Sequence, residues 1–369
     1  MSDTVDALVL DLLEWIGPRS GRPLRSMVSS PANLYRKAAP ALPFPPPGQS
    51  TCAGIAALFP TYLCDDLPSN YPSARGIGAC DARVAVAVTA SETAKIDLGR
   101  FGYFGLGATP DQAREIERLG YGTIWVGGSP PAELSFVEPL LESTTAIKVA
   151  TGIVNIWTAA AKPVAESFHR INNASPGRFV LGVGVGHPEA HAEYRKPYEA
   201  LVSYLDELDE YGVPAHQRVL AALGPRVLKL SAERAAGAHP ANATPEHAAQ
   251  ARAIIGPNAL LAPVHNVVLS SDAEKARAIG RAALAPYFSL SNYVSSWKRL
   301  GFTDADTTPP GSDKLIDAVI AHGTPDNIAK RLDEYLTAGA NHVAILVHGG
   351  PEKVLPTLSE LAGPLGLSR

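Results

Sequence analysis

From about residue 96 to the C-terminus, strand-like apolar runs alternate with segments in which apolar residues recur at helical spacing. The runs are mostly continuous in Val, Ile and Leu, as is typical of parallel strands buried on both faces. Eight strands are expected, within residues 96–106, 123–126, 147–157, 179–185, 218–223, 237–242, 260–269 and 342–347. The alternation predicts an α/β fold with a parallel sheet.

The intervening segments carry helix signals. In the clearest, Thr109 is an N-cap, Pro110 takes the first helical position, Gln112 closes a capping box and Gly120 provides a stop. Helices are expected within residues 109–119, 136–141, 164–171, 198–208, 226–236, 272–284, 291–300 and 312–321, from residues 244 and 324 onward, and at the C-terminus.

Eight strands alternating with helices over about 270 residues have the size and rhythm of a (β/α)₈ TIM barrel. The stretch between the seventh and eighth strands, residues 286–322, is too long for one crossover. We therefore expect an insertion there, suited to form a lid or a substrate wall. An open, doubly wound sheet is the main alternative, because it shows the same alternation. The barrel domain is expected to span residues 95–369.

Residues 1–94 differ in character from the rest. Apolar positions from Val5 to Ile16 fit one amphipathic helix, which Gly17 and Pro18 would end. After it the apolar period breaks up, and residues 39–48 are proline-rich. We expect a disordered or poorly ordered extension. A run-on or misread upstream coding segment is the alternative, and the sequence alone does not separate the two.

Composition narrows the class of protein. The chain is 46% hydrophobic, 18% charged and carries a net charge of −4, which argues against nucleic acid or an anionic membrane as a partner. No apolar run approaches the roughly 18–20 residues of a membrane span. The three cysteines, Cys52, Cys64 and Cys80, form neither a disulfide framework nor a zinc motif. We expect a cytoplasmic protein.

Two glycine-containing motifs stand at expected strand ends, where TIM barrels place their sites. Glycines between Gly182 and His187 would let backbone N–H groups approach a phosphate, although they could equally ease a tight turn. The run is no dinucleotide fingerprint, because His187 stands where the last glycine should be. In residues 151–155, Gly152 within an apolar strand marks either a ligand contact or a plain bend.

Histidines offer the remaining candidate chemistry. His187 and His191 stand four apart, but Pro188 and Glu189 break the zinc-protease pattern, so no metal is expected. His239, at a strand end, could donate a proton or contact a cofactor, although a lone histidine is more often structural. There is no nucleophile elbow, P-loop or catalytic carboxylate pair, and no catalytic residue is assigned.

Several motifs, in order, resemble the luciferase-like flavin and deazaflavin oxidoreductases. The resemblance is greatest to the actinobacterial branch presumed to use coenzyme F420, and it spans about residue 96 to the C-terminus. The motifs are Gly120–Gly127, Val149–Asn155, Pro176–Gly184, Gly237–Pro240, Thr244–His247 and Leu290–Tyr293.

This resemblance implies a site. Family members carry a non-prolyl cis peptide in the third strand, against the tricyclic ring, and the matching bond is Gly152–Ile153. Asn155 matches a position near the ring or substrate. Gly184, Gly186 and His187 match the loop that holds the cofactor phosphate. Fold relatives usually dimerise, so a homodimer is expected by analogy.

Three functions follow as hypotheses. The first is an F420-dependent oxidoreductase that transfers hydride between the deazaflavin and a small organic substrate. The second is an FMN-dependent luciferase-like monooxygenase. The third is a cofactor-binding protein without catalytic activity, which the lack of an assigned acid or base leaves open.

Overall fold

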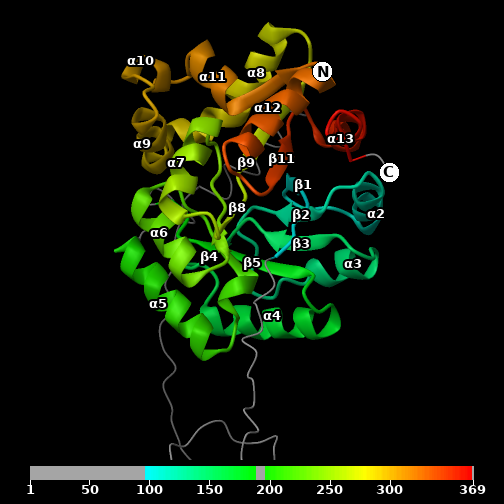
Figure 1. Cartoon of the computed structure of the whole chain (residues 1–369), viewed down its shortest axis with the longest axis vertical. Coiled ribbons are helices and arrows are strands. Elements are labelled where there is room, and N and C mark those ends of the chain that lie inside the picture. The colour runs from blue at the N-terminus through cyan, green and yellow to red at the C-terminus, as the bar shows by residue number, and fades with distance from the viewer. Residues whose placement is uncertain (1–95, 188–195, 368–369) are drawn as a thin grey trace, which may run out of the picture. The chain divides into compact units, whose positions relative to one another are not determined.

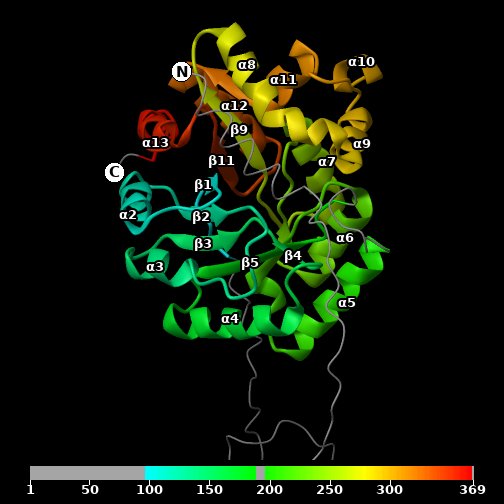
Figure 2. The same ribbon diagram turned by 180° about the vertical axis from the view of Figure 1, so that it is seen from behind.

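The computed structural model describes residues 96–187 and 196–367, which Figure 1 and Figure 2 show from opposite sides. The extension expected over residues 1–94 lies outside the described residues, and so does His191. The domain boundary expected between residues 94 and 95 therefore stays a prediction.

Parallel strands form the centre of the fold. Their order is β10-β9-β11-β1-β2-β3-β5-β6-β7-β8, with β4 paired to β5, and every pair is parallel. The strands are β1 (Phe101–Gly105), β2 (Thr123–Val126), β3 (Lys148–Thr151), β4 (Val154–Asn155), β5 (Phe179–Gly184), β6 (Arg218–Leu220), β7 (Gly237–Ala238), β8 (Leu260–Leu261), β9 (Val264–Leu269), β10 (Ile320–Gly323) and β11 (Val343–Val347).

The sheet closes on itself through β8 and β9. Only Ala262 and Pro263 separate these two strands in the sequence. On the side of β7, the N–H of Val264 donates to the carbonyl of Pro240 at 2.8 Å. On the side of β11, the N–H of Ala344 donates to the carbonyl of Pro263 at 2.9 Å. The barrel has eight strands if β3 and β4 count as one strand and β8 and β9 count as another. Among the described residues, strand β10 pairs only with β9 and is not part of the closed barrel. The predicted (β/α)₈ barrel is confirmed, and the open-sheet alternative is wrong.

Helices surround the strands on the outside (Figure 1). They are α2 (Pro110–Arg118), α3 (Val137–Glu142), α4 (Ala161–Ala174), α5 (Pro197–Glu210), α6 (Pro225–Arg234), α7 (Pro245–Ile255), α8 (Ala273–Leu284), α9 (Ser291–Arg299), α10 (Asp304–Thr307), α11 (Asp313–Val319), α12 (Pro325–Thr337) and α13 (Val354–Ala362), with short 3₁₀ helices at Ala215–Gln217, Ala285–Ser289 and Pro351–Lys353. The predicted capping box of α2 is confirmed: Oγ1 of Thr109 accepts from the N–H of Gln112, and Oε1 of Gln112 accepts from that of Thr109.

The apolar core has two main layers. One lies between the strands and the surrounding helices, where Ile116 and Phe168, for example, are fully buried. The other fills the barrel interior and is built from small and β-branched residues around a single large side chain, Trp125. The buried members of this inner layer are Leu98, Trp125, Ala150, Val180, Val219, Ala262, Val264 and Ala344.

The predicted insertion between the seventh and eighth barrel strands is present and has its own core around Trp297. One expectation about it is wrong: the helix expected over residues 312–321 ends at Val319, and Ile320–Gly323 form strand β10. The reason is tertiary, because β7 ends at Ala238 and leaves the edge of β9 free beyond it. β10 fills that edge, with Ile320 in register with Asn266.

Candidate functional site at the mouth of the barrel

Glycines stand where several strands end on one side of the barrel, and neighbouring side chains pack against them. A Cβ atom on Gly127 would lie 2.8 Å from Cζ of Phe104, and one on Gly152 would lie 2.5 Å from Cε2 of the same ring. Neither position accepts a larger residue while Phe104 stays in place. We call Phe104, Gly127, Gly152, Gly184 and His239 the barrel mouth. Glycine backbone lies beneath the Phe104 ring here, and a flat ligand could approach this backbone closely once the ring moved aside.

The peptide bond between Gly152 and Ile153 is cis, as the resemblance predicted. It lies between β3 and β4, and the side chain of Ile153 extends across β5. A Cβ on Gly182 would be 3.2 Å from Cγ2 of Ile153, and one on Gly184 would be 3.0 Å from its Cδ1. Oγ1 of Thr151 joins the two strands by accepting from the N–H of Gly182 at 2.8 Å. The β5 glycines therefore make room for Ile153.

Asn155 is buried and lies at the end of β4, two residues after Ile153. Its Oδ1 accepts from the N–H of Trp157 at 3.1 Å, and Nε1 of Trp157 donates to the carbonyl of Val185 at 2.8 Å. These bonds connect the turn after β4 to the loop after β5. Asn155 thus supports the wall of the site, and its predicted contact with ring or substrate stays a prediction.

The loop after β5 meets the insertion. Gly186 has a φ of +59°, which favours glycine, and Nδ1 of the following His187 lies 3.1 Å from Oδ1 of Asn292. The ring of His187 also packs against Tyr293, with centroids 5.3 Å apart. Asn292 stands in the first turn of α9, and a helix N-terminus attracts anions. The predicted phosphate loop therefore lies beside the start of α9, which falls within the Leu290–Tyr293 motif of the family resemblance.

His239 forms the floor of the mouth. Its ring stacks on Trp125, with centroids 3.9 Å apart and planes at 8°, and Nδ1 lies 2.7 Å from the carbonyl oxygen of Ala262. A carbonyl only accepts, so Nδ1 carries the hydrogen and Nε2 bears a lone pair. Burial lowers the pKa of His239 to about 3, which keeps the ring neutral at neutral pH.

A hydrogen bond from its indole nitrogen holds Trp125 in place. Its Nε1–H donates to Nε2 of His342 at 3.0 Å, and Nδ1 of His342 donates to the carbonyl of Gly99 at 2.8 Å. Burial lowers the pKa of His342 to about 4. This chain of contacts fixes the Trp125 ring and therefore the plane of His239 above it.

A second polar chain crosses the end of the barrel near the insertion. Nδ2 of Asn266 donates to Oδ1 of Asn242 at 2.9 Å, and Oδ1 of Asn266 lies 2.9 Å from Nε2 of His348. Burial lowers the pKa of His348 to about 4. Neither Asn266 nor His348 was singled out from the sequence, because each stands alone in an otherwise apolar or loop context.

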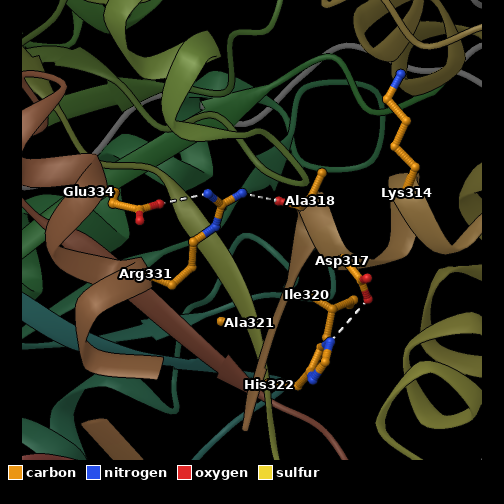
Figure 3. A pocket seen from close by; sticks show the side chains of 8 residues that line it. All are labelled: Lys314, Asp317, Ala318, Ile320, Ala321, His322, Arg331 and Glu334. Atoms are coloured by element: carbon orange, nitrogen blue, oxygen red, sulfur yellow. Dashed lines mark hydrogen bonds and ion pairs between the residues drawn. The ribbon is translucent and has the colours of Figure 1, made fainter. Parts of the chain in front are cut away.

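Two cavities lie outside this floor. One, of about 390 Å³, adjoins the mouth at the ends of β1 and β2 and is lined by Leu106, Gly107, Ala108, Val126, Gly127, Gly128, Pro130, Pro131 and Phe136. The other, of about 470 Å³, lies among α11, β10 and α12 (Figure 3). The second contains no predicted site residue, and four of its charged groups pair with one another, His322 with Asp317 at 3.0 Å and Arg331 with Glu334 at 2.7 Å. The larger cavity is therefore not the site.

Within residues 96–187 and 196–367, no group of three or more His, Cys, Asp or Glu side chains is placed to hold a metal ion. In the same ranges, no helix has both the length and the apolar character needed to cross a membrane.

Comparison with known proteins gives two sequence matches. Residues 80–211 match the family described as luciferase-like monooxygenase, a range that begins upstream of the expected domain boundary. The N-acetyl-S-alkylcysteine monooxygenase of Bacillus subtilis (strain 168) is 32% identical over an alignment of 116 residues that covers 27% of this chain. The match spans only 34% of the length of that enzyme.

Solved structures share the fold. An F420-dependent secondary alcohol dehydrogenase in complex with an F420-acetone adduct matches 73% of this chain and 99% of its own, with a TM-score of 0.57 and 14% identity. The F420-dependent tetrahydromethanopterin reductase of Methanopyrus kandleri matches 74% and 99%, with a TM-score of 0.54 and 15% identity. The oxygenating constituent of 3,6-diketocamphane monooxygenase of Pseudomonas putida, in complex with FMN, matches 71% and 95%, with a TM-score of 0.54 and 12% identity.

The architecture is thus that of a TIM barrel of the luciferase-like kind. The expected resemblance to the luciferase-like family is confirmed, in sequence over residues 80–211 and in fold over most of the chain. Both F420-dependent and FMN-containing proteins occur among the structural neighbours.

Proposed function

We propose that the protein is an oxidoreductase that binds coenzyme F420 at the barrel mouth and transfers hydride between the deazaflavin and a small organic substrate. One observation carries the proposal. The Gly152–Ile153 peptide, which the family resemblance singled out, lies at the barrel mouth, where glycine backbone stands beneath the ring of Phe104. When bound, the cofactor supplies the carbon that gives or takes the hydride, and the protein binds and orients it.

The chain offers a distinct group for each end of such a cofactor. Gly152 and Ile153 would support the tricyclic ring. Gly184, Gly186 and His187 would hold the phosphate, beside the first turn of α9, whose positive end favours an anion. The glycines fit this role because their lack of Cβ atoms lets the backbone approach the ligand.

The preference for F420 rests on the sequence motifs at residues 237–240, 244–247 and 290–293, and it is supported by F420-dependent neighbours of the same fold. A specific observation favours the alternative of an FMN-dependent monooxygenase: the curated relative from Bacillus subtilis is a monooxygenase. A homodimer, a cytoplasmic location and the absence of nucleic-acid or membrane partners stay predictions.

Side-by-side titration of the purified protein with F420 and FMN, followed by fluorescence quenching, tests the proposal. We expect F420 to bind at micromolar concentration or below and FMN to bind much more weakly. The opposite preference would assign the protein to the FMN monooxygenases. Tight F420 binding without any turnover across alcohols, enones and imines would favour a non-catalytic cofactor-binding protein.

The Gly184→Ala variant supplies a control for where the cofactor binds. A Cβ there would lie 2.9 Å from Cβ of Ala221, close to Ile153, whereas a Cβ on Gly224 would have no heavy atom within 4 Å. Gly224→Ala is therefore the matched substitution outside the site. We expect loss of F420 affinity in the first variant only, and equal affinity in both would place the cofactor elsewhere.

A further inference from the structure

The two ring nitrogens of His239 differ in their hydrogen bonding. Nδ1 donates to the carbonyl of Ala262 at 2.7 Å, while Nε2 is buried and has no hydrogen-bond partner among the described residues. A buried acceptor without a donor lowers stability, so it calls for an explanation. The fold does not provide one, because an apolar ring could stack on Trp125 equally well.

Nε2 of His239 is directed at the proposed cofactor position. A Cβ on Gly152 would lie 3.3 Å from this nitrogen, so Nε2 faces the α-carbon that begins the cis peptide. The ring has little freedom to turn away, since Trp125 stacks on its face and Ala262 holds Nδ1. The lone pair of Nε2 is therefore fixed in direction before any ligand arrives.

Phe104 covers this acceptor. Its ring lies over His239, with centroids 5.9 Å apart and planes at 27°, and fills the space above Gly127 and Gly152. Phe104 itself is only partly buried. Rotation of its side chain would uncover Nε2 and the backbone of both glycines together.

We propose that Nε2 of His239 accepts a hydrogen bond from an N–H or O–H group of the ligand that binds on the Gly152–Ile153 peptide, once the Phe104 ring has turned aside. This inference rests on the proposed function and adds a recognition rule to it. The ligand must present a donor to the floor of the mouth. A carboxylate or phosphate has no donor to offer the lone pair, so an anionic group would be excluded from this position.

Two sources can supply the donor, a ring N–H of the cofactor or a hydroxyl of the substrate. The His239→Phe variant separates them, because phenylalanine keeps the stack on Trp125 but lacks the acceptor. If the cofactor is the donor, the Kd for F420 rises about 5- to 10-fold, the loss expected for one neutral hydrogen bond. If the substrate is the donor, the KM rises by a similar factor while the Kd for F420 is unchanged.

His265 provides the matched control. It is also fully buried with an unpartnered Nε2, but its Nδ1 lies 2.7 Å from the hydroxyl of Tyr335, between β9 and α12. His265→Phe therefore removes the same kind of group outside the barrel interior. We expect it to leave both the Kd and the KM unchanged.

A measurement on the wild-type protein does not depend on the folding of any variant. In full-length protein labelled with ¹⁵N-histidine, the Nε2 resonance of His239 should move upfield when ligand saturates the site, as expected for an imine nitrogen that gains a hydrogen bond, while that of His265 should stay. An unmoved His239 resonance at saturation, with Kd and KM of His239→Phe equal to wild type, would overturn the inference but leave the proposed function intact. Failure of the wild type to bind either F420 or FMN would overturn both.

Discussion

Acid should destabilise this protein at a pH where most carboxylates are still ionised. Burial lowers the pKa of four histidines most strongly, His239 and His265 to about 3 and His342 and His348 to about 4, and it also lowers the pKa of His247. An unfolded histidine titrates near pH 6.5. Between about pH 6.5 and the pKa values of the folded protein, the unfolded chain binds more protons than the folded chain does. The contribution of these neutral histidines to the free energy of unfolding is therefore fully present above about pH 6.5 and is lost as the pH falls towards about 4.

The magnitude follows from the same values. A histidine that stays neutral in the folded state costs about 1.4 kcal/mol of stability for each pH unit below its unfolded pKa. At pH 5 this amounts to about 2 kcal/mol per residue, or about 8 kcal/mol for the four. Single domains are stable by about 5–15 kcal/mol, so the protein should be close to unfolding at pH 5.

Urea unfolding followed by tryptophan fluorescence, at several values between pH 7.5 and pH 5, measures this dependence. The free energy of unfolding should fall steeply below pH 6.5, and this dependence on pH should be weaker in His265→Phe. A free energy of unfolding that is the same at pH 7 and pH 5 would refute the reasoning, because it would mean that these side chains are not held neutral.

Three further substitutions have definite expected outcomes. Gly184→Ala should lower the free energy of unfolding by about 1–3 kcal/mol through overpacking, whereas Gly224→Ala should change it by less than about 1 kcal/mol; equal urea midpoints would contradict this. Asn292→Asp places a negative charge at the proposed phosphate site and should raise the Kd for F420 about tenfold at low salt and less at high salt, and an unchanged Kd would exclude the site. Asp209→Ala removes the ion-pair partner of the fully buried Arg218 side chain and should lower the free energy of unfolding by about 1–3 kcal/mol. This is less than the loss of a fully buried ion pair would cost, because Asp209 is half exposed. A loss below about 0.5 kcal/mol, measured by urea unfolding, would show that water replaces the carboxylate of Asp209.

Much of the barrel could be predicted because its elements are encoded locally. Strand β2 coincides with the expected residues 123–126, and Thr109 caps α2 as expected. Strand β10 could not be predicted from its own residues, since the segment is extended only because β9 offers a free edge. The sixth strand was expected over residues 237–242 but ends at Ala238, after which the chain turns His239 into the mouth.

Local patterns in the sequence drew attention to Gly152, to the loop from Gly182 to His187 and to His239, but the cis bond was predictable only from the family resemblance. That resemblance located the cis bond at Gly152–Ile153, which no local pattern indicates. The stack of His239 on Trp125, and the bond from Trp125 to His342, join residues far apart in the sequence. Such contacts depend on barrel closure, so a single sequence carries no local signal for them.

A crystal structure of the protein with F420 bound tests the central claim most directly. The account predicts the deazaflavin ring against the Gly152–Ile153 peptide, the phosphate at Gly184 to His187 beside Asn292, and the Phe104 ring displaced from His239. Cofactor bound elsewhere, for example in the cavity among α11, β10 and α12, with the barrel mouth unchanged, would contradict it.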